Sequence, residues 1–472
     1  MAVLADAAGT TGTLAELTRH EERQFLARQP RSLELTERAR SHLAGGATSS
    51  WMIARPAAVW VHHGAGSKVY DADGTEYVDL HAGYGAMVAG HAHPAVVEAV
   101  SRRVRLGTHF AQPTEDAIVV AELLAERFGL PLWRFTNSGT EATMDAVHLM
   151  RAITGRDLII KIEGSYHGHH DAVMVSMYSD EDELGPRDRP WSVAAGRGIP
   201  QAMVDLVVVV PFNDLVVLER ALEDHAGKIA GMIMEPLMMN AGIVPALPGY
   251  LEGVRELTRR HGVLLAYDEV KTGLTVGPGG ATALLGLEPD ILCLAKAMGG
   301  GVPCGAIGGT AEVMENIANG TYEQVGTFNG NPLTMAAARA ALTEVLVPEA
   351  YERFEVLGRR MLDGAMAALG RIGAPVYGHR FGAKGCLVFN PRPVRDYREF
   401  LAVDGYFSHA HWLIQHNGGV FLPPWGKSEQ WTLSAQHGME DADRFVANVE
   451  RMTEELSQLD CRTPDPSHHG FF

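Results

Sequence analysis

The stretch Glu288-Pro-Asp-Ile-Leu-Cys-Leu-Ala-Lys296-Ala-Met-Gly-Gly-Gly301-Val-Pro303 decides how we interpret this chain. Its apolar run Ile291–Ala295 predicts a short buried strand, and Lys296 follows that strand directly and precedes a run of glycines. Lysine is rarely buried without a partner or a chemical task, and desolvation makes its amine a nucleophile that can form a Schiff base. On this stretch alone, a surface lysine at the end of a strand is an equally good interpretation.

A second predicted strand, upstream, ends in a carboxylate. Residues 263–267 form a continuous apolar run, typical of a strand buried on both faces of a parallel sheet, and Asp268 follows it. Because open α/β sheets bind ligands at the carboxyl ends of their strands, we expect Asp268 to lie near Lys296. This pair suits pyridoxal phosphate (PLP). The lysine holds the aldehyde, and the carboxylate keeps the pyridine nitrogen protonated so that the ring can accept electrons.

Composition excludes several classes of partner. The 472 residues carry 57 acidic and 40 basic side chains, a net charge of −17, which argues against nucleic acid or an anionic membrane as the main partner. The four cysteines show neither paired nor metal-ligand spacing, so we expect reduced thiols and a cytoplasmic protein. The first residues lack the pattern of a signal peptide, and no apolar run is long enough to cross a bilayer.

The alternation of patterns along the chain predicts the fold class. From about residue 94 to residue 310, helix-like and strand-like stretches alternate, which favours an α/β fold with a mostly parallel sheet covered by helices. Before this region, residues 58–62, 68–70 and 75–80 predict a small antiparallel unit. After it, a helix over 333–346 leads into a smaller lobe that mixes helices with strands at 386–389 and 430–434.

Two further segments carry polar groups of the kind that gather at active sites. Ser138-Gly139-Thr140 opens a predicted helix, whose free N–H groups make a phosphate site, although a serine N-cap with a capping-box Glu141 is an equally common pattern. Glu235, at the end of the predicted strand Ile229–Met234, and Asn240 also stand where site residues collect, and either one also fits a structural cap.

The histidine-rich segment Tyr166-His167-Gly168-His169-His170-Asp171 allows two interpretations. His167, His169, His170 and Asp171 invite a metal site, but glycine interrupts the segment and the spacing is not that of a zinc hydrolase helix. We therefore favour stacking of Tyr166 or His167 on an aromatic ring, and predict no metal.

Together these segments resemble the class III (fold-type I) PLP-dependent aminotransferases, and among them the glutamate-1-semialdehyde aminomutases. The matching segments follow the family order between about residues 45 and 445. They are Asp71-Ala-Asp-Gly74, Gly90-His-Ala-His93-Pro94, Asn137-Ser-Gly-Thr-Glu-Ala142, Tyr166-His-Gly168, Glu235-Pro236, Asp268-Glu-Val270, Lys296 with Gly299-Gly-Gly301, and Gly326-Thr327. Each motif is weak alone, whereas the ordered set is specific.

The resemblance implies a domain organisation. A large PLP-binding domain over residues 83–338 would hold a mostly parallel seven-stranded sheet, and a smaller α+β domain would combine residues 1–82 with residues 339–460. Residues 461–472 would form a flexible tail. The family also implies a homodimer with shared active sites.

Each matching residue then takes a role by resemblance. Lys296 would be the Schiff-base lysine, and Asp268 would partner the pyridine nitrogen. The other implied contacts are Ser138, Gly139 and Thr140 with the phosphate, Tyr166 stacked on the ring, Val270 on the opposite face, Asn240 near the ring hydroxyl, and Thr327 with the phosphate of the neighbouring subunit's cofactor.

The substrate end departs from the family pattern. Aminomutases carry an arginine where this chain has Met52, and the segment Thr272-Gly273-Leu274-Thr275 lacks the arginine that is common in the wider class. Because a substrate carboxylate needs a cation, Arg55 and Lys427 are candidate replacements. Glu429 matches a site glutamate of the aminomutases.

The sequence thus predicts a PLP-dependent aminotransferase that moves an amino group between a non-α (β- or ω-) amino acid or amine and a keto acid. The first alternative is glutamate-1-semialdehyde 2,1-aminomutase, which transfers the group within one molecule. Two further alternatives are a metal-dependent hydrolase that uses the histidine-rich segment and a PLP-binding protein without activity.

Overall fold

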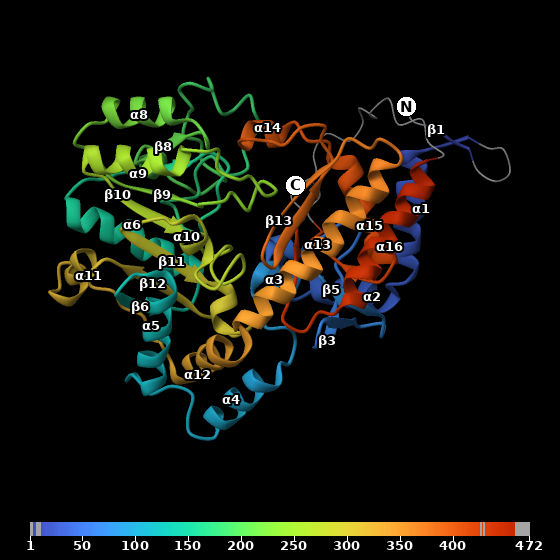
Figure 1. Cartoon of the computed structure of the whole chain (residues 1–472), viewed down its shortest axis with the longest axis horizontal. Coiled ribbons are helices and arrows are strands. Elements are labelled where there is room, and N and C mark those ends of the chain that lie inside the picture. Colours follow the sequence, from blue (N-terminus) through green and yellow to red (C-terminus); the bar gives the residue numbers. More distant parts are fainter. Residues whose placement is uncertain (1–2, 6–10, 425–426, 428–429, 458–472) are drawn as a thin grey trace.

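The computed structural model describes residues 3–5, 11–424, 427 and 430–457. Its largest sheet has seven strands in the order β6-β12-β11-β10-β9-β7-β8 (Figure 1). The expected mostly parallel sheet is confirmed, since β12 is the one strand of this sheet that runs antiparallel to its neighbours. The strands are β6 (Leu132–Thr136), β7 (Leu158–Ile162), β8 (Val207–Val210), β9 (Ile229–Met234), β10 (Leu264–Asp268), β11 (Ile291–Ala295) and β12 (Gly305–Gly309).

The central strands are apolar throughout because both faces of the sheet are covered. Every residue of β9 and of β11 is buried, and both strands have the bounds that the sequence predicts. In β10, Leu265 and Tyr267 join the cluster under α8 and α9, whereas Ala266 joins the cluster under α6. Side chains alternate between the two faces of a strand. A strand that is covered on both faces therefore carries apolar residues at every position.

Strand β12 is the element that sequence reasoning missed. Its sequence Gly305-Ala-Ile-Gly308-Gly309 is rich in glycine, which is depleted in strands. The structure explains the glycines, because a Cβ on Gly308 would lie 2.6 Å from the ring of Trp133, and one on Gly305 would lie 2.6 Å from the carbonyl oxygen of Ser138. Close packing against β6 and against the turn after it therefore selects glycine here.

The sheet is flanked by helices on both faces, and the chain before and after it contributes further helices (Figure 1). The helix α6 packs against β9, β11 and β12, while α8 packs against α9. No described helix combines the length and the apolar character that a membrane span requires. The helices in this part of the chain are α4 (Pro94–Val104), α5 (Glu115–Phe128), α6 (Gly139–Thr154), α7 (Gln201–Val204), α8 (Leu215–Asp224), α9 (Tyr250–His261), α10 (Gly280–Leu285), α11 (Ala311–Ala318) and α12 (Pro332–Ala340).

A four-stranded sheet combines three strands from the N-terminal part of the chain with one strand from the C-terminal part. The predicted antiparallel unit is confirmed as β3 (Val61–Ala65), β4 (Lys68–Asp71) and β5 (Glu76–Asp79), and β15 (Val420–Phe421) adds to it parallel to β5. The predicted strand at 58–62 was wrong in its bounds by three residues. Trp60 is held by a helix instead, because its backbone N–H donates to Ser32 Oγ at 3.1 Å and its indole N–H donates to Thr36 Oγ1 at 2.8 Å.

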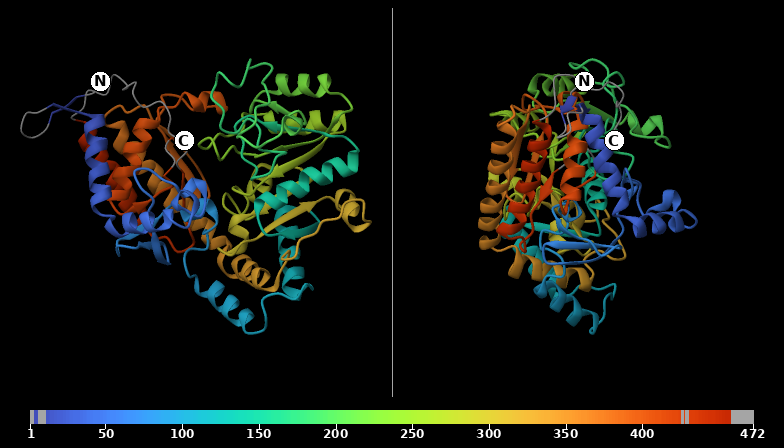
Figure 2. Two further views of the ribbon diagram at one scale, coloured as in Figure 1. Left: turned by 180° about the vertical axis from the view of Figure 1, so that it is seen from behind. Right: turned by 90° about the vertical axis from the view of Figure 1, so that its right-hand side faces the viewer.

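The remaining elements place the N-terminal and C-terminal segments side by side (Figures 1 and 2). Here α1 packs against α15 and α13 packs against α16. The predicted helix at 333–346 is α12 followed by a π-helical turn, Ala341–Val345. The elements are α1 (Leu14–Ala27), α2 (Pro30–Arg40), α3 (Ala82–Gly85), α13 (Pro348–Gly370), α14 (Tyr397–Leu401), α15 (Gly405–Asn417), α16 (Met439–Leu456), β13 (Tyr377–Phe381), β14 (Lys384–Val388) and β16 (Trp431–Thr432), with the short pair β1 (Val3–Ala5) and β2 (Thr11–Thr13).

We propose that the smaller domain combines residues 1–82 with 339–460 and that the large domain spans 83–338, as the sequence predicts. The pairing of β15 with β5 supports this division, since it links the segments on either side of the large sheet. The predicted flexible tail, 461–472, lies outside the described residues.

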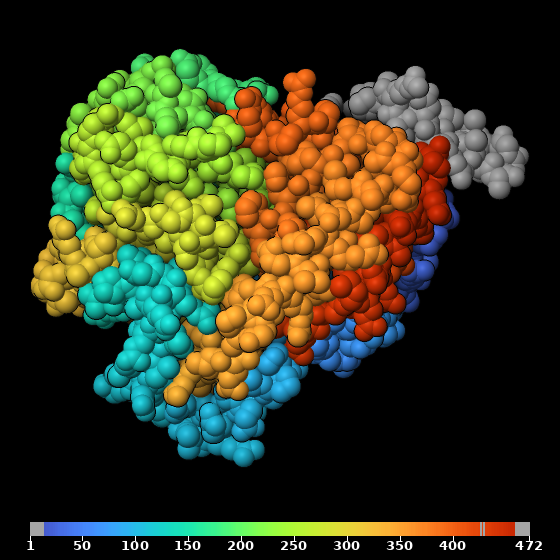
Figure 3. Space-filling model, in the orientation of Figure 1, coloured from blue at the N-terminus to red at the C-terminus, as the bar shows by residue number. Residues whose placement is uncertain are grey.

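A buried ion pair links α14 to the residue that follows β7. Figure 3 shows the orange C-terminal part of the chain packed against its green central part. Arg398, in α14, donates from Nε and Nη2 to the two carboxylate oxygens of Glu163, both at 2.9 Å, and from Nη1 to the carbonyl oxygen of Gly185 at 2.7 Å. The neighbouring Tyr397 packs against Gly164, where a Cβ would collide with its ring. Since Glu163 follows β7 directly, α14 fixes the start of the loop that carries Tyr166.

We predict that Arg398→Met lowers the free energy of unfolding by about 3–5 kcal/mol, because it leaves the Glu163 carboxylate buried without its guanidinium partner. Urea unfolding followed by circular dichroism measures the change. The matched control is Arg395→Met, which removes an exposed arginine paired with Glu399 one helical turn away and should have little effect. Equal losses in the two variants would contradict the role given to the buried pair.

The helix α15 buries histidines in neutral form. His416 packs among the rings of Phe25, Tyr77 and Trp412, and its Nε2 accepts from the Gln29 amide at 3.3 Å. Burial, with a smaller contribution from Arg28, lowers the pKa of His416 to about 3. The unfolded chain therefore binds a proton at this histidine that the folded chain does not bind.

We predict that His416 contributes to acid unfolding. Its folded pKa lies below the ordinary value of 6.5, so the stability that it contributes is present above pH 6.5 and is lost as the pH falls toward 3. His416→Gln should reduce the proton uptake on unfolding near pH 5 by about one proton. The slope of the unfolding free energy against pH measures this uptake, and exposed His42→Gln serves as the control. An unchanged slope in His416→Gln would show that this ring does not titrate on unfolding.

Candidate active site

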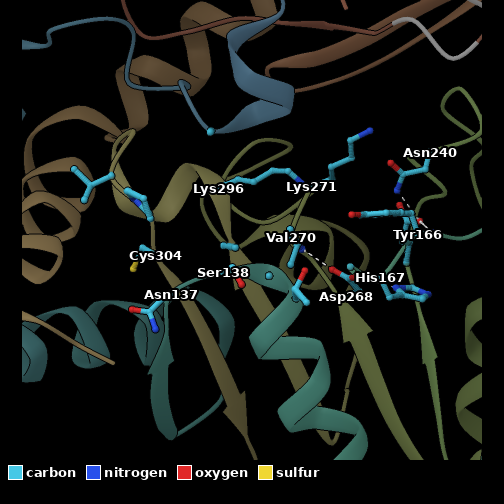
Figure 4. A pocket seen from close by; sticks show the side chains of 18 of the residues that line it. Asn137, Ser138, Tyr166, His167, Asn240, Asp268, Val270, Lys271, Lys296 and Cys304 are labelled. Atoms are coloured by element: carbon cyan, nitrogen blue, oxygen red, sulfur yellow. Dashed lines mark hydrogen bonds and ion pairs between the residues drawn. The ribbon is translucent and has the colours of Figure 1, made fainter. Parts of the chain in front are cut away.

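A cavity of about 340 Å³ opens at the carboxyl ends of β10 and β11. Figure 4 shows Tyr166, Asn240 and His167 on one side of it, Ser138, Asn137 and Cys304 on the other, and two lysines between them. The lining residues are Ala86, Asn137, Ser138, Gly139, Thr140, Tyr166, His167, Gly168, Glu235, Asn240, Asp268, Val270, Lys271, Ala295, Lys296, Gly301, Val302, Pro303 and Cys304. The structure thus brings together most of the residues that the sequence singles out.

Lys296 leaves β11 in a strained backbone conformation. Its φ is +48°, in the left-handed region that non-glycine residues seldom adopt, and the turn Lys296–Gly299 follows. Strain of this kind persists where the surrounding structure enforces it, often at functional sites. Burial lowers the pKa of Lys296, and the charges of Asp268 and Glu235 oppose that shift. Among the described residues no acceptor binds its Nζ, which leaves the amine available.

Asp268 ends β10 and is held on both of its oxygens. Its Oδ2 accepts from Nδ1–H of His167 at 2.7 Å, and its Oδ1 accepts from the backbone N–H of Val270 at 2.9 Å. Since a carboxylate only accepts, this hydrogen bond requires a proton on Nδ1 of His167. The buried Nε2 of His167 has no partner in the described structure. Asp268 pairs in register with Cys293 of β11, three residues before Lys296.

The N-terminus of α6 forms one wall of the cavity. Ser138 is the N-cap, and its Oγ accepts from the backbone N–H of Glu141 at 3.2 Å, so the capping interpretation of this motif holds. The Thr140 hydroxyl accepts from the backbone N–H of His169 at 3.2 Å. The first N–H groups of a helix have no helical partners, and Ser138, Gly139 and Thr140 line the cavity. The motif is therefore a helix cap whose position also suits an anion.

Glu235 organises the opposite wall. Its Oε1 accepts from the backbone N–H of Tyr166 at 3.3 Å and from Asn240 Nδ2 at 3.0 Å, and its Oε2 accepts from the backbone N–H of Met239 at 2.9 Å. The pKa of Tyr166 is raised by burial and by the charge of Asp268. Glu235 thus links the loop that carries Tyr166 to the segment that carries Met239 and Asn240.

Some predicted residues do not line the cavity of this chain. Thr327 and Arg55 are exposed and lie outside the lining. Lys427 donates instead to the carbonyl oxygens of Leu401 and Val403, at 2.7 and 3.3 Å. Glu429 lies outside the described residues.

The histidines of the metal alternative point to different partners. His167 binds Asp268, His169 is exposed, and His170 Nε2 lies 3.3 Å from the hydroxyl of Thr143. Burial, followed by the charges of neighbouring histidines, lowers the pKa of His170 to about 4. Within the described ranges no group of three or more histidine, cysteine or acidic side chains could hold a metal ion.

Sequence reasoning overlooked several lining residues, and the most consequential is Lys271. It lies three residues after Asp268, and its Nζ donates to the carbonyl oxygen of Met239 at 2.8 Å. Burial lowers the pKa of Lys271 to about 7, and the charge of Lys296 adds to that effect. A lysine directly after a buried strand that ends in a carboxylate is the signal that could have identified it.

The cavity suits PLP in both shape and chemistry. A Cβ on Gly139 would lie 2.8 Å from the Val270 side chain, and one on Gly168 would lie 2.7 Å from Thr140 Oγ1, so both glycines allow a close approach at the end of α6. The donor set is also appropriate, since it combines an available amine, a carboxylate held in place and free N–H groups for a phosphate.

Comparison with known proteins supports this assignment. A family model described as "Aminotransferase class-III" matches residues 52–370. Glutamate-1-semialdehyde 2,1-aminomutase 2 of Brevibacillus brevis is 38% identical over 426 residues, which cover 88% of this chain and 96% of that protein. Seven further curated relatives, 36–40% identical to this chain, are also named glutamate-1-semialdehyde 2,1-aminomutase.

Solved structures give the same family with both activities. An ω-transaminase from Sphaerobacter thermophilus is 36% identical, with a TM-score of 0.86 over 90% of this chain and 97% of that one. A glutamate-1-semialdehyde aminomutase from Pseudomonas aeruginosa, solved in complex with PMP, is 32% identical, with a TM-score of 0.86. The match covers 94% of this chain and 98% of that one. The chain therefore belongs to the class III aminotransferases, the fold-type I enzymes whose cofactor is PLP.

Proposed function

We propose that this enzyme transfers an amino group between a β- or ω-amino acid, or an amine, and a keto acid. The observation that carries the proposal is an available, partly buried amine, Lys296, near the Asp268–His167 pair, in a cavity whose described lining includes lysines but no arginine. When bound, PLP supplies an aldehyde for the amine and a ring that accepts an electron pair.

Lys296 is proposed as the general base and acid. Its lowered pKa leaves a larger fraction of the amine unprotonated near neutral pH than an exposed lysine would have, so Nζ can take a proton from the substrate carbon. With PLP bound, the same Nζ would also be placed to give that proton back, so that one amine serves as both base and acid. The low dielectric of the cavity strengthens each of these electrostatic interactions.

Asp268 and His167 are proposed to hold the charge that develops on the ring. Asp268 would face the pyridine nitrogen, and the Nδ1–H of His167 holds that carboxylate in its orientation. Ser138, Gly139 and Thr140 would bind the phosphate at the N-terminus of α6. Tyr166 would stack on one face of the ring with Val270 on the other, and Asn240 would lie near the ring hydroxyl.

We further propose a homodimer in which Thr327 reaches the phosphate in the neighbouring subunit. Thr327 is exposed, as are Val325 and Phe328 beside it, with 75% and 57% of their side chains accessible. Exposed apolar residues in a loop next to the cavity support an interface there. The loop is anchored close to the site, since Asn329 Oδ1 accepts from Asn137 Nδ2 at 3.0 Å. Cys293, Cys304 and Cys386 are free and buried, which suits the reducing cytoplasm that we propose as its location.

The second candidate is the aminomutase activity, which the names of the curated relatives favour. Against it stands Met52, which occupies the position of the aminomutase arginine, is exposed and lies outside the cavity lining. Both activities share the proton transfers assigned to Lys296. They differ in whether a free keto acid must enter the site.

We predict that Lys296→Ala lowers the rate of amino transfer by about 10³-fold or more, because both the nucleophile and the base are lost. The variant should also lose the lysine-linked chromophore that borohydride traps in the parent enzyme. Absorbance spectra and mass spectrometry after borohydride reduction test this. Lys228→Ala, at an exposed lysine, is the control. A trapped chromophore of unchanged position in Lys296→Ala would refute the assignment.

We also predict that turnover requires an added keto acid. With an amine donor alone, the cofactor should pass once to its amino form, and the aldehyde form should return when a keto acid is added. Absorbance spectra follow both changes. Isomerisation of glutamate-1-semialdehyde in the absence of a keto acid, at a rate matching the best donor pair, would establish the aminomutase instead.

A further inference from the structure

A buried aspartate on α6 forms no ion pair in the part of the chain that the structure describes. Asp145 is 6% exposed, and the next residue, Ala146, belongs to the core between α6 and the large sheet. Burial raises the pKa of Asp145, although its hydrogen bonds with Tyr322 and Gln324 oppose that shift. A carboxylate in such a place costs stability unless hydrogen bonds satisfy its oxygens.

Both carboxylate oxygens of Asp145 are bound by one loop. The hydroxyl of Tyr322 donates to Oδ1 at 2.7 Å, and the side-chain amide of Gln324 donates to Oδ2 at 3.0 Å. The same amide also donates to the carbonyl oxygen of Phe135 at 3.1 Å. The loop lies between α11 and α12, over residues 319–331, and contains turns but no helix or strand. Asp145 therefore attaches the first part of this loop to α6.

A second anchor fixes the other end of the same loop at the cavity. Asn137 lines the cavity, and its Nδ2 donates to Asn329 Oδ1 and to Glu141 Oε2, both at 3.0 Å. A Cβ on Gly326 would collide with the Asn329 side chain, so glycine is needed where the loop folds over it. The two anchors thus bracket residues 325–328.

The bracketed residues carry exposed apolar side chains. Val325 and Phe328 are 75% and 57% exposed, and Thr327 between them is exposed as well. The ring of Phe328 lies 4.9 Å from that of His109, whose neighbour Phe110 is 48% exposed. Apolar side chains that gather at the surface indicate contact with another protein molecule.

The hydrogen bonds of Asp145 hold the loop more than they hold the core. Both of its hydrogen-bond partners in the described structure belong to the loop, and neither Tyr322 nor Gln324 is fully buried. An apolar side chain at position 145 could join the core beside Ala146, and water could then solvate the two partners. What the carboxylate adds is therefore the attachment of the loop.

We infer that Asp145 is a positioning residue that holds this loop in the conformation in which it meets a second copy of the chain. The inference rests on the proposed homodimer, in which Thr327 reaches the phosphate in the neighbouring subunit. A loop that is ordered before association loses less conformational entropy when the two copies meet. The helix α6 then serves two cofactor sites. Its N-terminus suits the phosphate of its own subunit, and Asp145 positions the residue proposed for the neighbouring one.

The test is a double-mutant cycle on the holoenzyme between Asp145→Asn and Thr327→Val. Asparagine keeps the size of the aspartate but turns an NH2 group toward one of its two donors. We expect the dissociation constant of PLP to rise about 10- to 100-fold in Thr327→Val, the loss of one charged hydrogen bond, and at least about threefold in Asp145→Asn. In the Thr327→Val background, Asp145→Asn should change that constant less than about twofold, because it acts through the same hydroxyl. Release of PLP on dilution, followed by fluorescence, gives the constant.

The dissociation constant of the dimer is the second measurement, made by analytical ultracentrifugation. It should rise at least about threefold in Asp145→Asn, because the loop must then be ordered during association. The matched control is Asp157→Asn, which removes an exposed carboxylate shortly after the end of the same helix. This control should leave both constants unchanged.

The other outcomes distinguish the role of Asp145 from the role proposed for Thr327. If Thr327→Val weakens PLP binding and Asp145→Asn changes neither constant, the inference is overturned and the proposed shared site stands. If Thr327→Val leaves PLP binding unchanged while Asp145→Asn weakens the dimer, the proposed phosphate contact is wrong and the anchoring of the loop stands. Additive losses of PLP affinity, or a monomeric parent enzyme, would overturn the inference. Should Asp145→Asn fail to fold, Tyr322→Phe removes one donor at a half-buried position and takes its place in the cycle.

Discussion

The site depends on keeping the partly buried amine of Lys296 and the buried carboxylate of Asp268 near each other but not in contact. In a medium of low dielectric the two charges attract strongly, and a direct ion pair would close the space that a flat ring needs. The structure prevents this on both sides. His167 and the N–H of Val270 hold Asp268, and the left-handed backbone of Lys296 turns its side chain at the end of β11. The strain at Lys296 and the ordered loop at His167 are both consequences of this requirement.

Much of this arrangement could be predicted from the sequence because apolar strands and their end residues leave a local signal. The bounds of β9 and β11 follow from continuous apolar runs, and Asp268, Lys296 and Ser138 stand directly at the ends of elements. Glycine-rich β12 gave no such signal, because Gly308 packs against Trp133, 175 residues earlier in the chain, and Gly305 packs against Ser138.

Residues in the C-terminal part of the chain contribute to the site mainly by fixing loops that lie earlier in the sequence. Arg398 and Tyr397 hold the segment between β7 and Tyr166, while Gln430 donates to the carbonyl oxygen of Gly242 at 2.6 Å. Neither group touches the Asp268–His167 pair, yet both act on loops that carry lining residues. Buried polar contacts of this kind are costly to leave unpaired, so they favour one relative placement of the two halves.

The parallel pairing of β5 with β15 has a consequence for synthesis on the ribosome. The residues of β5 emerge first, and those of β15 follow more than three hundred residues later. Until then β5 has an open edge, and α1 lacks the partner helix α15 that covers it. Contacts so distant in sequence form slowly, and exposed strand edges recruit other chains. The N-terminal segment therefore cannot complete its sheet or cover α1 until most of the chain has been synthesised.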